Sequence, residues 1–265
     1  VTANLLEGRV AILADNTPLA LIVPTTFWML LQAPGDYYQA FWVGTAFRWI
    51  RFIAFLVALT IPALYVMLAT FHQEMIPTPM ALNVAGGREG TPLPTLVEVL
   101  LMTFLFEVLN EAGLRLPQAV GQSVSIVGGL VVGQAAVQAG LVAPATVIVV
   151  ATAGLNAFAL PSYSLSLTLR VVRVPLLLAT GFLGVFGFIG VTSVLALHAA
   201  SLRSFGEPFL APIAPVLFVE QQDTLVRAPW FNLLKRPRLG QSPNTDRQPA
   251  GQMPSPRNDQ GAGKP

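Results

Sequence analysis

Two acidic residues one helical turn apart, Glu107 and Glu111, are the side chains of this sequence best suited to chemistry. They lie in the apolar stretch TLVEVLLMTFLFEVLNEAGLRL, residues 95–116, where they share one helix face and Glu98 lies on the opposite face. Arg115 follows Glu111 by four positions, which favours a helical ion pair with a spare acid. The alternative is an intramembrane acid that serves cation passage. Glu107 and Glu111 are therefore our cation-attracting candidates.

The histidines and short motifs of the chain argue against catalysis and metal binding. His72 and Glu74 occur in HQEM, but a second histidine at the spacing of a zinc-binding helix is missing, and the only other histidine is His198. The sequence has no G-x-S-x-G, P-loop or dinucleotide-binding pattern. It also has no cysteine, which removes disulfides and thiolate ligands. We predict no enzyme activity, no catalytic residue, no metal and no cofactor.

A stretch of small and amide side chains is the second candidate site. GQSVSIVGGLVVGQAAVQAG, residues 121–140, is apolar enough for a membrane helix yet rich in glycine and glutamine. On a helical wheel, one stripe about 80° wide collects Gln118, Gln122, Ser125, Gly129, Gly133, Ala136 and Gly140. Such a stripe allows close packing of membrane helices or lines a narrow aqueous path, and a ring of subunits permits both. The first six residues of the stripe are our pore-lining candidates.

Membrane helices are the elements predicted to position these residues, so the fold class is mainly α. Of the 265 residues, 54% are hydrophobic and 11% are charged, whereas ordinary soluble domains carry about 25% charge. Apolar segments long enough to cross about 30 Å of hydrocarbon predict four spans, at residues 52–71, 118–139, 144–161 and 176–197. Residues 95–116 would make a fifth, but their three glutamates oppose insertion. We expect that segment as a helix in the membrane interface or packed inside an assembly.

Shorter patterns divide the chain into regions. Two apolar runs separated by the turn formers DNTP predict a β-hairpin near the N-terminus, at the end of a truncated soluble domain. The tail lacks the apolar content needed to order itself. The predicted regions are the end of an N-terminal cytoplasmic domain at residues 1–36, a helical transmembrane domain at 37–203, a C-terminal cytoplasmic segment at 204–237 and a disordered tail at 238–265.

Aromatic and basic residues predict how the helices meet the membrane. An aromatic and basic belt that includes Arg48 and Arg51 precedes the first span, Pro62 should kink that span, and Arg170 and Arg173 are expected at a membrane surface. Residues 72–94, dense in Pro and Gly, predict a loop. An even number of spans puts both chain ends on the side with most Lys and Arg, so both termini are predicted to be cytoplasmic.

Six segments of the chain resemble, in consistent order, the A subunit of the GerA-type spore germinant receptors. They are EGRVAILADNTPLALIVP, FHQEMIPT, FEVLNEAGLRLP, VGQSVSIVGGLVVGQAAVQAGLV, SFGEPFLAPIAP and RAPW, and they extend from about Glu7 to Pro237. The resemblance covers the membrane part of that family and the end of its N-terminal cytoplasmic domain. One departure is Leu93, which stands where an aromatic residue is expected and leaves the fold expectation intact.

The resemblance implies a protein of the spore inner membrane that works with a transporter-like B subunit and a C-subunit lipoprotein. It further implies that the A subunit forms an oligomeric channel that releases cations when nutrient binds, with nutrient sensing assigned mainly to B. Carried onto this chain, it makes residues 118–139 the pore helix and places Glu107 and Glu111 near the mouth. Gln122, Ser125, Gly129 and Gly133 would face inward.

Two other function classes stay open. A secondary transporter usually duplicates its halves and places ionisable groups at the bilayer midplane, and the sequence shows no internal repeat. An intramembrane enzyme requires a nucleophile with a base or a metal cluster, and neither is visible. The net charge of +2 is too small to favour nucleic acid as a partner.

Overall fold

The computed structural model describes residues 1–115, 117–217, 220–237, 244–249 and 251–253. The chain folds into two compact units. The terminal unit contains residues 1–29, 34–48 and 200–265, and the helical unit contains residues 30–33 and 49–199. Helix is the main secondary structure, with an antiparallel hairpin near the N-terminus. The predicted fold class, mainly α with a small β-hairpin, is confirmed.

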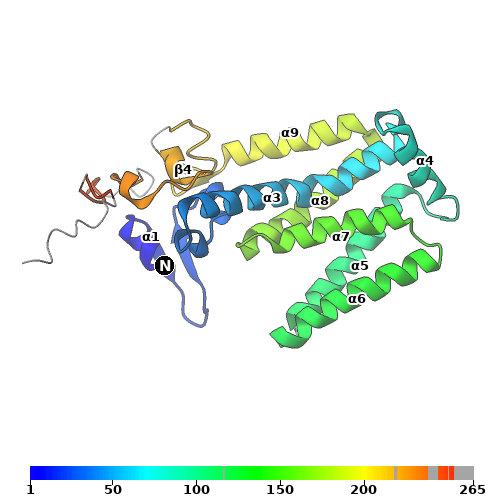
Figure 1. Ribbon diagram of the computed structural model, residues 1–265, viewed down its shortest axis with the longest axis horizontal. Helices are drawn as coiled ribbons and strands as arrows, with labels where there is room; N and C mark the ends of the chain where they lie inside the picture. The colour runs from blue at the N-terminus through cyan, green and yellow to red at the C-terminus, as the bar shows by residue number, and fades with distance from the viewer. Residues whose placement is uncertain (116, 218–219, 238–243, 250, 254–265) are drawn as a thin grey trace, which may run out of the picture. The chain divides into compact units, whose positions relative to one another are not determined.

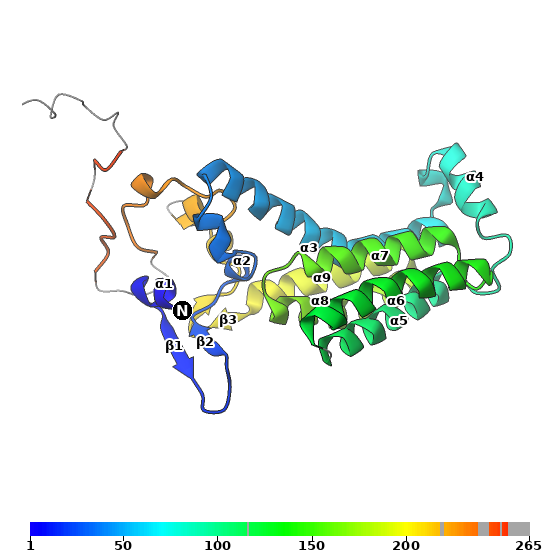
Figure 2. The same ribbon diagram turned by 60° about the horizontal axis from the view of Figure 1, so that its bottom comes forward.

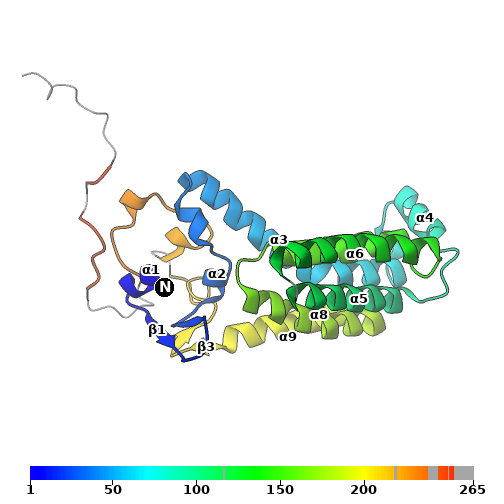
Figure 3. The same ribbon diagram turned by 90° about the horizontal axis from the view of Figure 1, so that it is seen from below.

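The helical unit is built from long helices that run back and forth along one direction (Figure 1, Figure 3). They are α3 (Phe41–Thr70), α5 (Thr95–Arg115), α6 (Gln118–Gln138), α7 (Pro144–Phe158), α8 (Tyr163–Leu183) and α9 (Val185–Ser201). Between α3 and α5, the turn η2 (Gln73–Met75) and the short helix α4 (Thr78–Gly86) lie at one end of the unit (Figure 2). The loop predicted at residues 72–94 is thus partly helical, because proline suits the first turn of α4.

A break at Gly184 separates α8 from α9. Gly184 has φ +59°, a left-handed conformation that costs glycine little because it lacks a Cβ. The chain reverses between the two helices, so the chain direction of α9 is opposite to that of α8 (Figure 1). A Cβ on Gly187 would lie 2.0 Å from the carbonyl oxygen of Ala179, so the reversal requires bare backbone there. The prediction of one continuous span at residues 176–197 is wrong, because its glycines form a turn between two helices.

Two helices in the described part of the chain, α3 and α8, are long and apolar enough to cross a membrane. α3 has 30 residues with Pro62 inside it, so the predicted first span and the aromatic segment before it form one helix. α7 and α9 are apolar but have only 15 and 17 residues. Helices are present where spans were expected at residues 118–139 and 144–161. The count of four or five crossings stays a prediction.

The core of the helical unit is formed by residues from α3, α5, α7 and α8 together with the turn before α7. Its buried residues are Ala63, Val66, Val99, Met102, Val142, Val150, Leu176 and Leu177. The α5 helix packs against α6, α7 and α8 of the same chain. The segment with three glutamates is therefore packed among other helices, which turns part of its polar surface toward them.

The terminal unit contains the predicted hairpin. Strand β1 (Val10–Leu13) pairs antiparallel with β2 (Ala20–Val23), and Asn16 in the turn between them has φ 64°. Asparagine tolerates this left-handed conformation better than most residues. The unit also includes the start of α3 and the end of α9. Its other elements are α1 (Thr2–Leu6), α2 (Phe27–Leu30), η1 (Pro34–Tyr37), β3 (Arg203–Ser204), β4 (Glu207–Pro208), η3 (Glu220–Asp223) and η4 (Trp230–Asn232).

Part of the predicted disordered tail is described, and it makes contacts within the terminal unit. Asp246 forms a β-bridge with Lys235, and Arg247 pairs with Glu7 at 2.8 Å. Residues 238–243, 250 and 254–265 lie outside the described residues. The predicted region boundaries and the disorder of the tail stay predictions.

Candidate functional site: buried charges among the helices

A cluster of charges lies between α5 and α8 inside the helical unit. Glu107 Oε2 and Arg170 Nη1 are 3.2 Å apart, and the two side chains are 32% and 15% exposed. Asn110 lies one turn along α5 against the same guanidinium, and it accepts from Nη1 at 3.2 Å when its amide oxygen faces Arg170. Glu107 therefore pairs with a neighbouring helix, and the spare acid of the sequence analysis has a partner.

Arg173 lies one turn beyond Arg170 on α8 and is 3% exposed. Its Nε and Nη2 atoms are buried, and no described residue hydrogen-bonds them. Among the described side chains, one acid, Glu107, faces two arginines, so this cluster has a net charge of +1. An uncompensated charge among apolar helices is costly and marks a functional position in membrane proteins. The side chain of Arg173 is thus buried within the protein, and its expected place at a membrane surface stays a prediction.

Glu111 pairs with Arg115, as their spacing predicts, with Oε1 2.8 Å from Nη2 and 3.1 Å from Nε. The two side chains are 57% and 79% exposed. A surface pair of this kind contributes about 0.3–0.5 kcal/mol to helix stability. The two acids proposed to act together thus have different environments, since Glu107 is half-buried against α8 and Glu111 is exposed.

Glu98 is fully buried and joins α5 to α7 and to the loop after α4. Its Oε2 accepts from the backbone N–H of Ala143 at 3.2 Å and from the Thr146 hydroxyl at 2.9 Å. Arg88 Nη2 lies 3.8 Å from the other oxygen, Oε1, which receives no hydrogen bond from the described residues. Ala143 is the N-cap of α7. Glu98 therefore satisfies N-terminal donors of α7 and places a negative charge at the positive end of its dipole.

Sequence reasoning gave Glu98 no role of its own. The sequence placed it only on the helix face opposite Glu107 and Glu111. The available signal was the start of α7, where Pro144 and Thr146 begin a helix without an acidic residue in its first turn. Such a terminus favours a carboxylate supplied by another element.

The α6 stripe is described for three of its six candidates. A Cβ on Gly129 would lie 3.5 Å from Phe106, and a Cβ on Gly133 would lie 3.1 Å from Val147. Ala136 packs against the core. These contacts come from α5 and α7 of the same chain, as close packing requires. The side chains of Gln118, Gln122 and Ser125 lie outside those described, so the pore-lining role stays a prediction.

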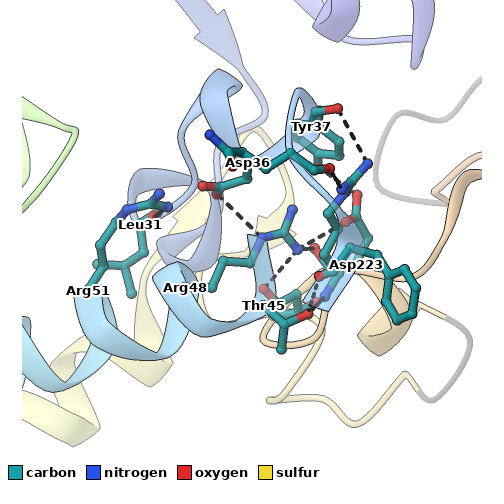
Figure 4. Close-up of polar contacts among 11 residues, drawn as sticks. Leu31, Asp36, Tyr37, Thr45, Arg48, Arg51 and Asp223 are labelled. Carbon is teal, nitrogen blue, oxygen red and sulfur yellow. Dashed lines mark hydrogen bonds and ion pairs between the residues drawn. The ribbon is translucent and has the colours of Figure 1, made fainter. Parts of the chain in front are cut away.

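In the terminal unit, buried charges join the start of α3 to the C-terminal segment (Figure 4). Arg48 Nη1 donates to the Asp223 carbonyl at 2.7 Å and to its Oδ1 at 2.9 Å, and Nε lies 3.5 Å from Asp36 Oδ2. The Tyr37 hydroxyl donates to Asp223 Oδ2 at 2.7 Å. Burial, and then the charge of Asp223, raise the pKa of Tyr37, so this hydroxyl stays protonated. The Arg48 side chain is only 2% exposed, and its predicted place in a belt at the membrane surface stays a prediction.

Arg227 closes the same cluster from the C-terminal segment. Its Nη1 donates to the Gln39 carbonyl at 2.6 Å, and its backbone N–H donates to the Thr45 hydroxyl at 3.0 Å. A Cβ on Gly44 would lie 2.7 Å from the Asp36 carbonyl oxygen, so this close approach depends on glycine. The cluster fixes residues 223–227 on the first turns of α3. Among the residues whose side chains are described, no three acidic or histidine groups could hold a metal ion.

The two helices long and apolar enough to cross a membrane, α3 and α8, indicate a helical membrane protein. Residues 1–239 match the family described as Bacillus/Clostridium GerA spore germination protein. The chain is 44% identical over 256 residues to spore germination protein KA of Bacillus subtilis (strain 168), covering 97% of this chain and 47% of that protein. For spore germination protein GerLA of Bacillus cereus, the identity is 39% over 249 residues, covering 94% and 51%. No solved structure matches this chain.

This chain belongs to the GerA family of spore germination proteins. It is also 45% identical over 237 residues to the uncharacterized membrane protein YfkQ of Bacillus subtilis (strain 168), covering 89% of this chain and 46% of YfkQ. The chain spans about half the length of these curated relatives. The resemblance seen in the six segments is thus confirmed at the level of the family.

Proposed function

We propose that this chain is the membrane part of the A subunit of a nutrient-responsive germination receptor in the spore inner membrane. The observation that carries the proposal is the family match over residues 1–239. The two long apolar helices α3 and α8 support a place in a membrane. In this proposal the subunit works with a transporter-like B subunit and a C-subunit lipoprotein, and both of its termini are cytoplasmic.

The subunit forms an oligomeric cation channel in this proposal, with the α6 stripe along the passage. Gln118, Gln122, Ser125, Gly129, Gly133 and Ala136 supply amides, a hydroxyl and bare backbone, which an aqueous lumen tolerates better than hydrocarbon does. Phe106 lies against Gly129 of the stripe, and Val147 lies against Gly133. A passage along α6 therefore opens only where these two side chains move aside.

Glu107 and Glu111 attract cations to this passage in the same proposal. The exposed Glu111 presents its charge to solvent, although Arg115 partly compensates it. The charge of Glu107 is paired with Arg170, so Glu107 contributes to the surrounding field only after that pair separates. The structure therefore favours Glu111 as the acid that acts on cations in the resting protein.

Reconstitution of the full-length protein in planar bilayers tests the channel function. The expected result is a unitary conductance far above the rate of any carrier cycle, and spores that lack the gene should release fewer cations when exposed to nutrient. The alternative is a secondary transporter of ions or small solutes. Slow, saturable uptake by this protein alone, with no conductance, would favour that alternative.

A further inference from the structure

A cavity of about 470 Å³ lies beside α4. The α4 helix itself is at one end of the helical unit (Figure 2). The cavity is lined by the last turn of α3, η2, α4 and the start of α5, and it is open to solvent on one side. Its apolar wall consists of Ala69, Ile76, Ala81, Val84, Ala85 and Pro94. Its polar lining includes Arg88, Glu89 and Thr95. A cavity of this size with few convergent polar groups is typical of small-molecule sites.

Arg88 is the cationic group of this cavity, and its internal partners satisfy it only in part. The guanidinium hydrogen-bonds the Thr95 hydroxyl, but its distance to the buried carboxylate of Glu98 is 3.8 Å. A charge-assisted hydrogen bond is about 2.7–2.9 Å long. Glu98 Oε1 is buried and has no hydrogen-bond donor among the described residues. The ion pair between Arg88 and Glu98 is thus longer than a charge-assisted hydrogen bond. The Arg88 side chain, which lines the cavity, is 22% exposed.

We propose that this cavity binds a small organic carboxylate with an apolar body. The guanidinium of Arg88 pairs with the ligand carboxylate in a forked geometry, which planar guanidinium and carboxylate groups favour. The alanine, valine and isoleucine side chains enclose the apolar body of the ligand. The Arg88 guanidinium favours a carboxylate over a neutral solute of the same shape, and the carboxylate of Glu89, which also lines the cavity, opposes this preference.

Occupation of the cavity acts on the helical bundle through Glu98. A ligand carboxylate competes with Glu98 for Arg88, and Glu98 caps the N-terminus of α7. The loop that carries Arg88 also lies close to α7, since a Cβ on Gly87 would be 3.7 Å from Pro144. Binding therefore shifts the contacts that hold the loop after α4 on the start of α7.

Binding of 4-methylpentanoate to the full-length protein in lipid nanodiscs tests this proposal, with isothermal titration calorimetry as the readout and empty nanodiscs as the blank. Saturable binding is expected, and the neutral amide of the same shape, 4-methylpentanamide, should bind about tenfold or more weakly, because it lacks a charge-assisted hydrogen bond. Equal affinity for the acid and the amide would overturn the proposal. So would a protein that shows no saturable binding of the acid.

Three variants and one control locate the site. Arg88→Gln should lose about tenfold or more in affinity, and Ala85→Leu should abolish binding by filling the cavity while keeping the guanidinium. Glu98→Gln should bind the acid several-fold more tightly, because the internal competitor loses its charge. Arg115→Gln is the control, since Arg115 is an exposed arginine in a surface pair.

Unchanged affinity in the cavity-filling variant would place the ligand elsewhere and refute the proposal, even if Arg88→Gln does not fold. Weaker binding in Glu98→Gln would refute the competition between the two carboxylates. This proposal goes beyond the channel function, because the measurement needs no ion flux. A binding result and a conductance result can thus fail separately.

Discussion

Replacement of Glu107 by glutamine tests the charge cluster between α5 and α8 most directly. The change removes the one acid among the described residues that faces Arg170 and Arg173, so the net charge of the cluster rises from +1 to +2. Arg170→Gln has the opposite effect, since it leaves one acid facing one arginine. The double variant returns the cluster to +1. The structure therefore predicts an order of stability loss in which Glu107→Gln costs most and Arg170→Gln costs least.

The magnitude follows from the geometry of the pair. At 3.2 Å, two unit charges attract by about 5 kcal/mol at an effective dielectric constant of about 20. Desolvation and partial exposure cancel much of this attraction, and coupling energies between contacting residues are about 0.5–3 kcal/mol. We expect Glu107→Gln to destabilise the protein by about 2–3 kcal/mol. The double-mutant cycle of Glu107→Gln and Arg170→Gln should give a coupling energy between the two residues of about 1–2 kcal/mol. Glu111→Gln should cost about 0.3–0.5 kcal/mol.

The assay is reversible unfolding of the full-length protein in SDS mixed micelles, followed by far-ultraviolet circular dichroism. The two single variants and the double variant form the thermodynamic cycle, and Glu111→Gln is the matched control on the same helix. If Arg170→Gln proves at least as destabilising as Glu107→Gln, the charge count that we assign to this cluster is wrong. Equal costs for Glu107→Gln and Glu111→Gln would show that the pair with Arg170 contributes nothing.

Three further changes probe other parts of the helical unit. Gly129→Leu should block cation release while protein levels stay normal, because the new side chain fills the proposed passage. Gly190→Leu, whose Cβ position is open, is the control. Normal cation release by Gly129→Leu would count against the passage. Gly187→Ala should destabilise by about 3 kcal/mol or more, since backbone 2.0 Å away cannot move aside; a stable variant would contradict the turn between α8 and α9. Glu98→Ala should cost about 3–5 kcal/mol in unfolding measurements, and a loss under 1 kcal/mol would exclude a capping role.

The sequence predicted the positions of several helices well because their boundaries have local causes. Pro117 and Pro144 mark the starts of α6 and α7, and the charge-free stretch that follows Arg115 allows long apolar helices. The hairpin of β1 and β2 was predictable for the same reason, because DNTP is a strong local turn signal. These elements depend on residues that are close together in the chain.

The break at Gly184 and the partners of the glutamates could not be read in the same way. Glycines at a spacing of three are compatible with a packed helix, and only the close approach of Gly187 to Ala179 shows that the chain reverses there. Arg115 is the local partner of Glu111, four residues away, whereas Glu107 pairs with Arg170, 63 positions away. Partner choice between helices depends on their packing, which local patterns do not encode.

The shortness of two helices has a consequence for the lipid around this protein. At about 1.5 Å per residue, the 15 residues of α7 and the 17 of α9 extend for about 22 and 26 Å, less than a hydrocarbon layer of about 30 Å. Where such helices face acyl chains, the bilayer must thin or polar flanks must sink into it, and each ångström of mismatch costs a fraction of a kcal/mol. The thickness of the membrane thus becomes a variable that bears on the stability of this protein.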